Sequence, residues 1–319
     1  VNKVDNLGGA GLVAEFYKLG LGEPTPISAY HGRGTEDLLD RIVALLPTAT
    51  AAPEVTDMMK LAIVGRPNVG KSMLLNAILG QERTIVNDVP GTTRDAIDTV
   101  FESESQRCLL IDTAGIRRAG KVGVGVEKYS VLRARQAIER ADIALLLIDA
   151  SEGITAQDSH VAGFVQKAYK GVVLIVNKWD VIEDQNEDAY IAAIRDKFRF
   201  LSYAPIIFIS AKLGTGVKHV LPMAKQVYEE RLKRIPTAGL NDMMQVAWRE
   251  HNPPSVHGKR LRIVFVTQAV VNPPTFVFFV NNPTLVHFSY QRYLENRLRE
   301  AFGFMGTPLR LIFKAKGGK

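Results

Sequence analysis

The sequence predicts an α/β protein in which a doubly wound parallel sheet is followed by a smaller α+β domain. Short runs rich in Ile, Leu and Val alternate with helix-length segments, which is typical of strands buried on both faces of a parallel sheet. A pattern in the first 47 residues occurs a second time later in the chain. After residue 236 the expected order becomes helix, strand, strand, helix, strand. The length of 319 residues fits two or three domains.

Charge separates the last quarter of the chain from the rest. The formal net charge is +7, and residues 237–319 hold 11 basic and four acidic residues, so the rest of the chain is neutral overall. A concentrated basic excess favours contact with nucleic acid or with an anionic membrane. The composition, with 46% hydrophobic and 23% charged residues, excludes a largely disordered chain.

The sequence also bears on compartment. The single cysteine, Cys108, excludes an internal disulfide framework and fits a reducing cytosol. No apolar run approaches the roughly 18 residues of a membrane helix, and no signal peptide is visible. We therefore expect a cytoplasmic protein without a membrane partner. The chain begins at Val1 rather than Met, so we expect a fragment of a longer protein.

The strands of the parallel sheet are expected at five apolar runs. These runs are Leu61–Val64, Cys108–Ile111, Ile143–Ile148, Val172–Val176 and Ile206–Ile209. Helix-length segments such as 128–140 and 189–200 separate most of them. In an open α/β sheet, ligands bind beyond the carboxyl ends of the strands, so the residues that follow these runs are the candidates for a site.

An internal repeat divides the chain. An N-K-x-D motif followed by a Ser-Ala pair occurs twice in the same order. The first copy consists of Asn2, Lys3, Val4 and Asp5 with Ser28 and Ala29, and the second of Asn177, Lys178, Trp179 and Asp180 with Ser210 and Ala211. Residues 1–47 are therefore predicted to be the last part of a domain whose complete copy covers residues 58–233. Residues 48–57 are small, polar and Pro-bearing, which indicates a linker.

A phosphate-binding loop is predicted between the first strand of the complete copy and the helical segment 73–79. Its eight residues are Gly65, Arg66, Pro67, Asn68, Val69, Gly70, Lys71 and Ser72, in the pattern G-x-x-x-x-G-K-S. Glycines let backbone N–H groups surround the phosphates, and the helix N-terminus adds positive potential. Lys71 is expected on the β- and γ-phosphates, and the hydroxyl of Ser72 on Mg²⁺.

Further residues are expected around the γ-phosphate. Asp112, Thr113, Ala114 and Gly115 follow the second strand, where Asp112 can hold Mg²⁺ through a water and the Gly115 N–H can face the phosphate. Of Thr92 and Thr93, we favour Thr93 as a further Mg²⁺ ligand. The segment 116–126, which contains Arg117 and Arg118, is predicted either to be a loop that the γ-phosphate orders or to be an ordinary solvated loop.

A guanine site is predicted at the ends of the last two strands. The carboxylate of Asp180 can accept both the N1–H and the exocyclic N2–H of guanine, and adenine would leave that carboxylate desolvated without these donors. Lys178 can lie over the base plane, with Asn177 and Trp179 completing the motif. Ser210, Ala211 and Lys212 offer a backbone N–H to guanine O6. Asn2, Lys3, Val4, Asp5, Ser28 and Ala29 would be the remnant of the same site in the first copy.

These motifs resemble those of Era-like GTPases. Two such domains in tandem with a small basic α+β module resemble the Der (EngA) family of ribosome-assembly GTPases over the whole chain. The resemblance implies a P-loop GTPase fold in one complete and one partial copy, and a KH-like domain at 237–319. It implies GTP and GDP as ligands with Mg²⁺, the large ribosomal subunit and rRNA as partners, and a monomer. It also implies that Asn68 coordinates K⁺, although Asn68 could equally shape the loop.

Two features of the sequence predict the catalytic behaviour of the complete and the partial copy. Ile116 stands where Ras-like enzymes carry a glutamine that positions the attacking water, and its side chain cannot hydrogen-bond to water, so slow turnover is expected. No phosphate loop precedes Asn2, so the partial copy is not expected to hydrolyse GTP. The nucleotide is expected to order residues 92–95 and 116–126 and so to move the KH-like domain.

The basic module is expected to contact RNA, or else to present an ordinary solvated face. The candidate contacts are Arg292, Arg297, Arg299, Lys314 and Lys316. Residues 303–306 have the G-x-x-G spacing of an RNA-gripping KH loop but precede a strand, so we favour a helix-ending turn. Alternation puts Phe276 and Phe278 on one side of their strand and Phe279 on the other.

Other functions remain in view. A non-catalytic RNA-binding module could use the nucleotide as a structural ligand, which Ile116 favours. A metabolic phosphotransferase is disfavoured by the motif at 177–180. A related Era-like GTPase acting on tRNA is disfavoured by the duplicated domain.

Overall fold

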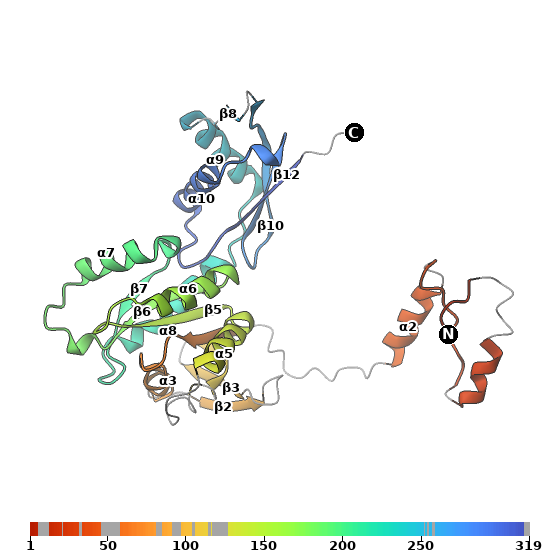
Figure 1. Ribbon diagram of the computed structural model, residues 1–319, viewed down its shortest axis with the longest axis horizontal. Helices are drawn as coiled ribbons and strands as arrows, with labels where there is room; N and C mark the ends of the chain where they lie inside the picture. Colours follow the sequence, from red (N-terminus) through yellow and green to blue (C-terminus); the bar gives the residue numbers. More distant parts are fainter. Residues whose placement is uncertain are drawn as a thin grey trace. The chain divides into compact units, whose positions relative to one another are not determined.

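The structure is a computed structural model, and the chain forms two compact units, residues 1–57 and 58–319, which are described separately (Figure 1). The described residues are 1–5, 13–20, 22–31, 34–45, 58–80, 85–90, 97–103, 106–113, 116, 127–251, 253, 255–256 and 259–315. Among them, no helix is both long and apolar enough to cross a bilayer.

The first unit contains two helical segments and a short extended contact. The 3₁₀ helix η2 (Glu15–Leu19) ends at Gly20, which adopts a left-handed conformation with φ 65°. Helix α2 (Thr35–Leu45) follows. The Val4 N–H donates to the Ile27 carbonyl at 3.0 Å, and the Ile27 N–H donates to the Val1 carbonyl at 2.8 Å. These bonds hold the first residues beside the segment that leads into α2.

The second unit is built on one seven-stranded sheet, which confirms the doubly wound α/β prediction (Figure 1). In spatial order its strands are β2 (Ile85–Pro90), β3 (Ile97–Ser103), β4 (Gln106–Leu110), β1 (Met59–Val64), β5 (Ile143–Asp149), β6 (Gly171–Asn177) and β7 (Ile206–Phe208). The five expected strands pair in parallel, but β2 and β3 add an antiparallel edge that the apolar runs did not indicate.

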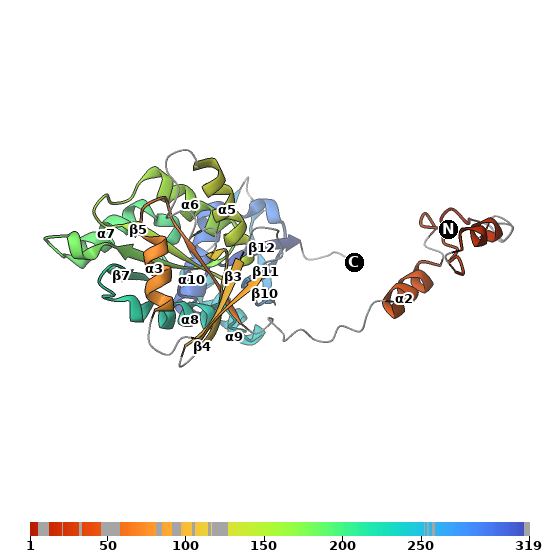
Figure 2. The same cartoon turned by 90° about the horizontal axis from the view of Figure 1, so that it is seen from below.

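Helices cover both faces of the sheet (Figure 2). Helices α5 (Glu127–Arg140), α6 (Ala156–Lys167) and α7 (Glu187–Lys197) pack on one face. Helices α3 (Lys71–Leu79) and α8 (Val220–Arg231) pack on the other. Every residue of β5 and β6 is buried as a result, which explains their continuous apolar sequences. Short 3₁₀ turns, η4 (Trp179–Val181), η5 (Arg199–Leu201) and η6 (Val217–His219), lie between these elements.

The C-terminal domain has the predicted helix, strand, strand, helix, strand order. Its main elements are α9 (Thr237–Glu250), β10 (Ile263–Val270), β11 (Thr275–Val280), α10 (Phe288–Phe302) and β12 (Arg310–Ala315), with a small hairpin of β8 (Ser255–Val256) and β9 (Lys259–Arg260) and the turn η7 (Pro283–Leu285). Strand β11 is central, antiparallel to β10 and parallel to β12. Phe276 and Phe278 are fully buried in the core beneath the helices.

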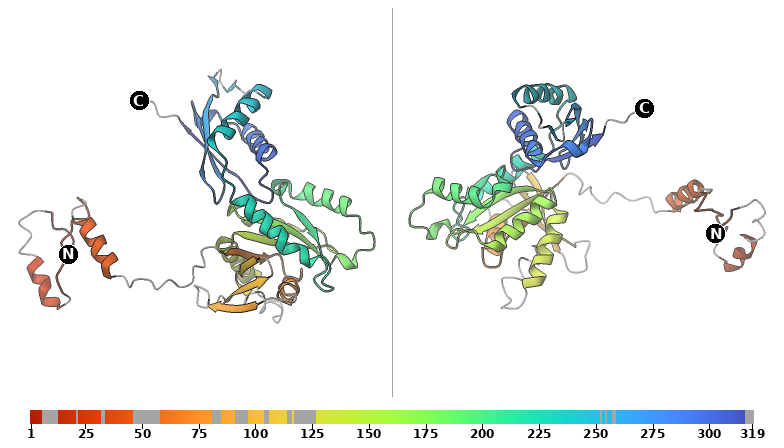
Figure 3. Two further views of the ribbon diagram at one scale, coloured as in Figure 1. Left: turned by 180° about the vertical axis from the view of Figure 1, so that it is seen from behind. Right: turned by 45° about the horizontal axis from the view of Figure 1, so that its top comes forward.

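The C-terminal domain lies next to the larger domain in both views of Figure 3, and it contacts the amino-terminal end of β6. The Val172 N–H donates to the Gly306 carbonyl at 2.8 Å, and the Gly306 N–H donates to the Tyr203 carbonyl at 2.8 Å. Gly306 has φ 67°, and a Cβ there would lie 2.4 Å from a Val227 methyl group. The segment 303–306 is therefore a helix-ending turn seated on the larger domain, as favoured, and is not open to grip RNA.

Arg299 belongs to the same interface. Its guanidinium lies over the Tyr203 ring, 4.1 Å from the centroid, and donates to the carbonyls of Phe304 and Thr307 at 3.0 and 2.9 Å. It also pairs with Glu295 at 2.8 Å. Burial raises the pKa of Tyr203 and keeps its phenol neutral. Arg299 therefore joins the two domains, and the RNA contact expected of it is replaced by this structural role.

Candidate nucleotide-binding site

The predicted phosphate loop connects β1 to α3 and is shaped by residues in left-handed conformations. Gly65 has φ 150°, and a Cβ there would lie 2.7 Å from the Leu147 carbonyl oxygen. Gly70 has φ 101°, and its Cβ would lie 2.2 Å from Asn177 Nδ2. Asn68 has φ 65°, a region that asparagine tolerates better than most residues. Side chains at the two glycines would push the loop away from the strands that support it.

Lys71 begins α3 and is held inside this loop. Its Nζ donates to the carbonyl oxygens of Gly65 at 2.9 Å and Arg66 at 2.6 Å. Burial is the main cause that lowers the pKa of Lys71 to about 8, the Arg66 charge adds to the effect, and Asp158 opposes it. A bound phosphate chain would supply the counter-charge that this ammonium lacks.

The expected Mg²⁺ ligands are linked through the backbone of Ile116. Ser72 Oγ donates to the Ile116 carbonyl at 2.7 Å, and the Ile116 N–H donates to the Asp112 carbonyl at 3.4 Å. The Asp112 N–H in turn donates to the buried carboxylate of Asp98 at 3.0 Å. A hydroxyl and a carboxylate are hard oxygen donors, so this set fits Mg²⁺.

Of the other residues expected around the γ-phosphate, the structure describes Thr113 and Ile116. Thr113 is buried, and its hydroxyl lies 2.9 Å from that of Thr99, so it supports the loop from below. The Ile116 side chain packs into the core on the α3 side of the sheet, where it cannot reach a water. Thr92, Thr93, Ala114, Gly115, Arg117 and Arg118 lie outside the described residues.

Asn177 joins the phosphate loop to the last predicted motif. It ends β6 and is almost fully buried. Its Nδ2 donates to the Val69 carbonyl at 2.7 Å, and its Oδ1 accepts from the Ala211 N–H at 2.9 Å. One amide side chain therefore fixes the distance between the loop for phosphates and the loop expected to meet guanine O6.

The remaining residues of the guanine motif divide into exposed and buried groups. Asp180 and Lys212 are exposed at this edge, as expected of groups that meet a ligand. Trp179 is buried, with its ring centroid 5.3 Å from Tyr190 and 4.4 Å from Phe208. The indole therefore anchors the loop from below, and the neighbouring polar residues Asp180 and Lys212 face outward.

Lys178 has a left-handed backbone conformation, with φ 62°, and forms an ion pair with Asp149 at the end of β5. Burial alone would raise the pKa of Asp149. Hydrogen bonds from Lys178 and Ser151 outweigh that effect and leave the pKa below its usual value. Asp149 thus stays charged and holds Lys178 beside the expected base position.

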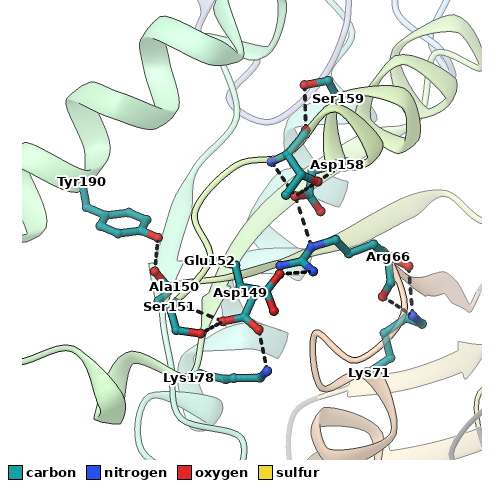
Figure 4. A network of polar contacts seen from close by, with 12 residues as sticks. Arg66, Lys71, Asp149, Ala150, Ser151, Glu152, Asp158, Ser159, Lys178 and Tyr190 are labelled. Carbon is teal, nitrogen blue, oxygen red and sulfur yellow. Dashed lines mark hydrogen bonds and ion pairs between the residues drawn. The ribbon is translucent and has the colours of Figure 1, made fainter.

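Three acidic residues, one at the end of β5 and two after it, were missed by the sequence reasoning (Figure 4). Arg66 of the phosphate loop pairs with Glu152 at 2.6 Å and with Asp158 at 3.5 Å, and Asp149 pairs with Lys178 of the guanine motif. This segment, residues 149–158, therefore contacts both halves of the site, and we call it the brace. Its position after a buried strand and the Thr-x-x-Asp capping pattern at 155–158 were the available signals.

The first unit repeats the local geometry of the guanine region. Asn2 Oδ1 accepts from the Ala29 N–H at 3.1 Å, as Asn177 does from Ala211. Lys3 has φ 68°, close to that of Lys178. Gly34 and Gly216 correspond as well, since a Cβ on either would lie 2.5 Å from the carbonyl oxygen eight residues earlier. Ser28 Oγ also donates to Asp5 Oδ1 at 2.6 Å.

The remaining candidate RNA contacts differ in their surroundings. Arg297 forms ion pairs with Glu250 and Glu300, at 3.0 and 2.9 Å. Arg292 and Lys314 are exposed. Lys316 lies outside the described residues.

Comparisons with known proteins identify relatives over the whole chain. Residues 60–178 match the family described as 50S ribosome-binding GTPase, and residues 234–314 match the C-terminal KH-domain-like domain of EngA bacterial GTPase enzymes. GTPase Der of Thermomicrobium roseum is 53% identical over 310 residues, which cover 95% of this chain and 67% of that protein. GTPase Der of Chloroflexus aggregans is 50% identical over 322 residues, covering 100% and 72%. A crystal structure of Era with MgGDPNP and a segment of 16S ribosomal RNA matches with a TM-score of 0.41 and 23% identity, covering 81% of this chain and 92% of that one.

Proposed function

This chain belongs to the GTPase Der family, and from that premise we propose that its complete nucleotide site hydrolyses GTP as a switch in assembly of the large ribosomal subunit. The protein binds GTP and GDP, and it contacts rRNA or ribosomal particles according to which nucleotide is bound. It works as a monomer in the cytoplasm, where these particles are. The KH-like domain at 237–319 supplies RNA contacts.

The observation that carries the proposal is the bridge made by Asn177. A site that must read guanine and position a triphosphate at once needs a fixed distance between its two recognition loops. The buried amide of Asn177 holds Val69 of the phosphate loop and Ala211 of the base loop at 2.7 and 2.9 Å. Neither a phosphate-binding turn alone nor a surface N-K-x-D sequence alone would require such a bridge.

In the proposed reaction, this chain's residues bind and orient the nucleotide. Lys71 exchanges its two backbone acceptors for β- and γ-phosphate oxygens. The hydroxyl of Ser72, and Asp112 through a water, would hold Mg²⁺, which would supply positive charge to neutralise the phosphates. Asp180 accepts the two guanine N–H groups, and Lys178, held by Asp149, covers the base.

Turnover is proposed to be slow and stimulated by K⁺. The Ile116 side chain is buried in the core, so no side chain at this position orients the attacking water. Asn68 stands in the phosphate loop with φ 65° and is proposed to offer its amide oxygen to K⁺ beside the phosphates. Hydrolysis measured in K⁺ and in Na⁺ at equal ionic strength tests this, and equal rates would contradict the role of K⁺.

Residues 1–47 are proposed to be the end of a first GTPase domain, joined by the linker 48–57 to the complete domain at 58–233. The guanine-motif geometry at Asn2, Lys3 and Ala29 supports this. In this chain the remnant is proposed to be catalytically inactive, with hydrolysis coming from the complete site.

The deciding experiment is binding to purified large ribosomal subunits with GDP and with a non-hydrolysable GTP analogue. We expect tighter binding in one nucleotide state, and we expect Lys71→Ala to remove the difference. Equal binding in both states, or none, would contradict the switch. A second candidate function is an RNA-binding module with a structural nucleotide, which the buried side chain of Ile116 favours. GTP turnover that stays unchanged in Lys71→Ala would support this second candidate.

A further inference from the structure

The C-terminal domain leaves one face of its sheet without a covering helix among the described residues. Helices α9 and α10 lie on one side of the sheet formed by β10, β11 and β12, and the other side of these strands carries no helix of the domain in Figure 1. On this open face, β10 presents Phe265 and β11 presents Phe279, in register with each other. Phe279 is also in register with Lys314 of β12. An aromatic pair and a lysine therefore form one row across the three strands.

The charged residues of the domain are distributed unevenly along its sequence. All four acidic residues after position 236 lie in α9 and α10, together with four basic residues, so the helices are neutral overall. The strands, turns and tail hold seven basic residues and no acidic one, namely Lys259, Arg260, Arg262, Arg310, Lys314, Lys316 and Lys319. Of these seven, Arg260, Arg262, Arg310 and Lys314 have described side chains, and all four are exposed.

The positive groups nearest to the aromatic pair are exposed. Arg260 and Arg262 are exposed, whereas Leu261 and Ile263 beside them are buried in the core. Asn281, which follows β11, bonds to the backbone of both arginines and so keeps them at the same end of the sheet as Phe279. Lys314 is exposed as well. These residues with Phe265 and Phe279 are called the open-face patch.

The aromatic pair presents ring surface to solvent. The rings of Phe265 and Phe279 are stacked, with centroids 4.3 Å apart and planes 12° from parallel. Phe265 keeps 38% of its surface exposed. Aromatic rings beside positive groups are the usual platform for unpaired nucleic acid, because each base stacks on a ring while the phosphates meet the cations.

The outer edge of β10 is a poor site for an added peptide strand. Asn241 of α9 accepts from the Val266 N–H at 3.0 Å and donates to its carbonyl at 3.2 Å. The outer edge of β10 is therefore already paired at its middle, and a protein strand cannot add there without displacing Asn241.

We propose that the open-face patch binds single-stranded RNA, with a base stacked on Phe265 and phosphates at Lys314, Arg262 and Arg260. This inference rests on the proposed role at the ribosome and names the surface that serves it. The turn at 303–306 is seated on the larger domain, and Arg297 and Arg299 of α10 are paired with glutamates. The open-face patch is the basic surface that these contacts leave accessible within the described part of the domain.

The test measures binding of the full chain to a 12-nucleotide single-stranded RNA and to a duplex of equal length, at several salt concentrations. Phe265→Ala is expected to weaken binding of the single strand about tenfold and to affect the duplex little, because only unpaired bases stack. Phe265→Tyr keeps the ring and is expected to bind like the parent. Lys314→Ala is expected to weaken both and to reduce the salt dependence by about one phosphate contact.

Arg292→Ala is the matched control, since it removes one exposed charge from α10 on the opposite side. It is expected to stay within about twofold of the parent. The melting temperature and the affinity for GDP should be unchanged in all four variants, which excludes unfolding as the cause.

The outcomes separate this inference from the proposed function. If the parent binds RNA and Phe265→Ala binds it equally well, or if Arg292→Ala loses as much as Lys314→Ala, the patch is overturned while RNA binding stands. If the parent binds large subunits but not single-stranded RNA, the patch is likewise overturned and a protein of the particle is the partner. If the parent binds neither, the ribosomal role itself fails.

Discussion

At the scale of single residues, the motif positions were predictable because their chemistry requires particular side chains. Asn177, Lys71 and Asp180 were predicted from motif spacing, and in the structure the side chains of Asn177 and Lys71 both bond to the phosphate loop. Trp179 and the brace acids could not be assigned in this way. Whether a side chain beside a motif faces the ligand or the core depends on partners such as Tyr190 and Phe208, which are far away in the sequence.

Asp180 is expected to set the choice of base. The Asp180→Asn substitution replaces two acceptor oxygens with one acceptor and one donor, which suits xanthine, whose C2 carries a carbonyl oxygen. We expect affinity for GDP to fall at least tenfold and affinity for xanthosine diphosphate to rise. Titration of both nucleotides by calorimetry measures the exchange. An unchanged preference for guanine would show that Asp180 does not contact the base.

Nucleotide affinity should depend on pH through Lys71. The pKa of Lys71 is about 8 before a ligand binds, and phosphate charge would raise it, so binding takes up a proton once the pH exceeds that value. Affinity for GDP is therefore expected to be full below pH 8 and to fall as the pH rises towards 9. Lys71→Met should bind weakly but with a flat profile between pH 7 and 9. A flat profile for the parent would contradict the lowered pKa.

Arg66 should matter for stability as well as for the nucleotide. Its side chain is 11% exposed and pairs with Asp158, which is fully buried. Arg66→Ala leaves a buried carboxylate without its counter-charge, and removal of one partner from such a pair costs about 3–5 kcal/mol. Urea denaturation of the nucleotide-free protein measures the loss. The double variant Arg66→Ala with Asp158→Asn should recover part of it, whereas simple additivity would argue against the pairing.

At the scale of elements, alternation and periodicity predicted most of the strands and helices, because a strand that is buried on both faces has a continuous run of apolar residues. The edge strands β2 and β3 were missed. Strand β3 mixes Asp98 and Thr99, both buried but polar, with Val100 and Phe101, so it lacks a continuous apolar run. The contact of the turn at 303–306 with the larger domain could not be predicted from the sequence either, because it depends on Val227 and Tyr203 of that domain.

Gly306 tests that docking. Gly306→Ala adds both a strained φ and a Cβ 2.4 Å from Val227, whereas Gly214 has φ 76° with nothing within 4 Å of its Cβ. The backbone strain common to both substitutions costs about 1–2 kcal/mol. Gly306→Ala should therefore destabilise clearly more than Gly214→Ala in thermal unfolding. Equal decreases in melting temperature would mean that the turn accommodates a side chain and does not pack tightly against Val227.

At the scale of the whole second unit, one strand serves two purposes. Strand β6 carries Asn177 of the nucleotide site at its carboxyl end and Val172, which bonds to Gly306, near its amino end. Because β6 is completely buried, the two domains that share it are expected to unfold together.

Arg299→Ala should uncouple them. It removes the contact with Tyr203, which crosses between the domains, and two hydrogen bonds within the C-terminal domain, to the carbonyls of Phe304 and Thr307 in the segment that is seated on the larger domain. Hydrogen bonds from charged groups contribute about 1.5–3 kcal/mol each at most. We expect the single calorimetric transition of 58–319 in the full chain to split into two, with GDP raising only the larger domain's transition. Arg292→Ala should keep a single transition, and a single transition in Arg299→Ala would mean that other contacts suffice.

The buried indole of Trp179 gives the molecule an optical property. The sequence contains two tryptophans, Trp179 beside the base-recognition residues and Trp248 in α9 of the C-terminal domain. Each domain of the second unit therefore contains its own fluorophore. Replacing Trp248 with Phe would leave one tryptophan, directly bonded in sequence to the exposed Asp180, so that with excitation selective for tryptophan the arrival and departure of a nucleotide could be followed in real time without any attached dye.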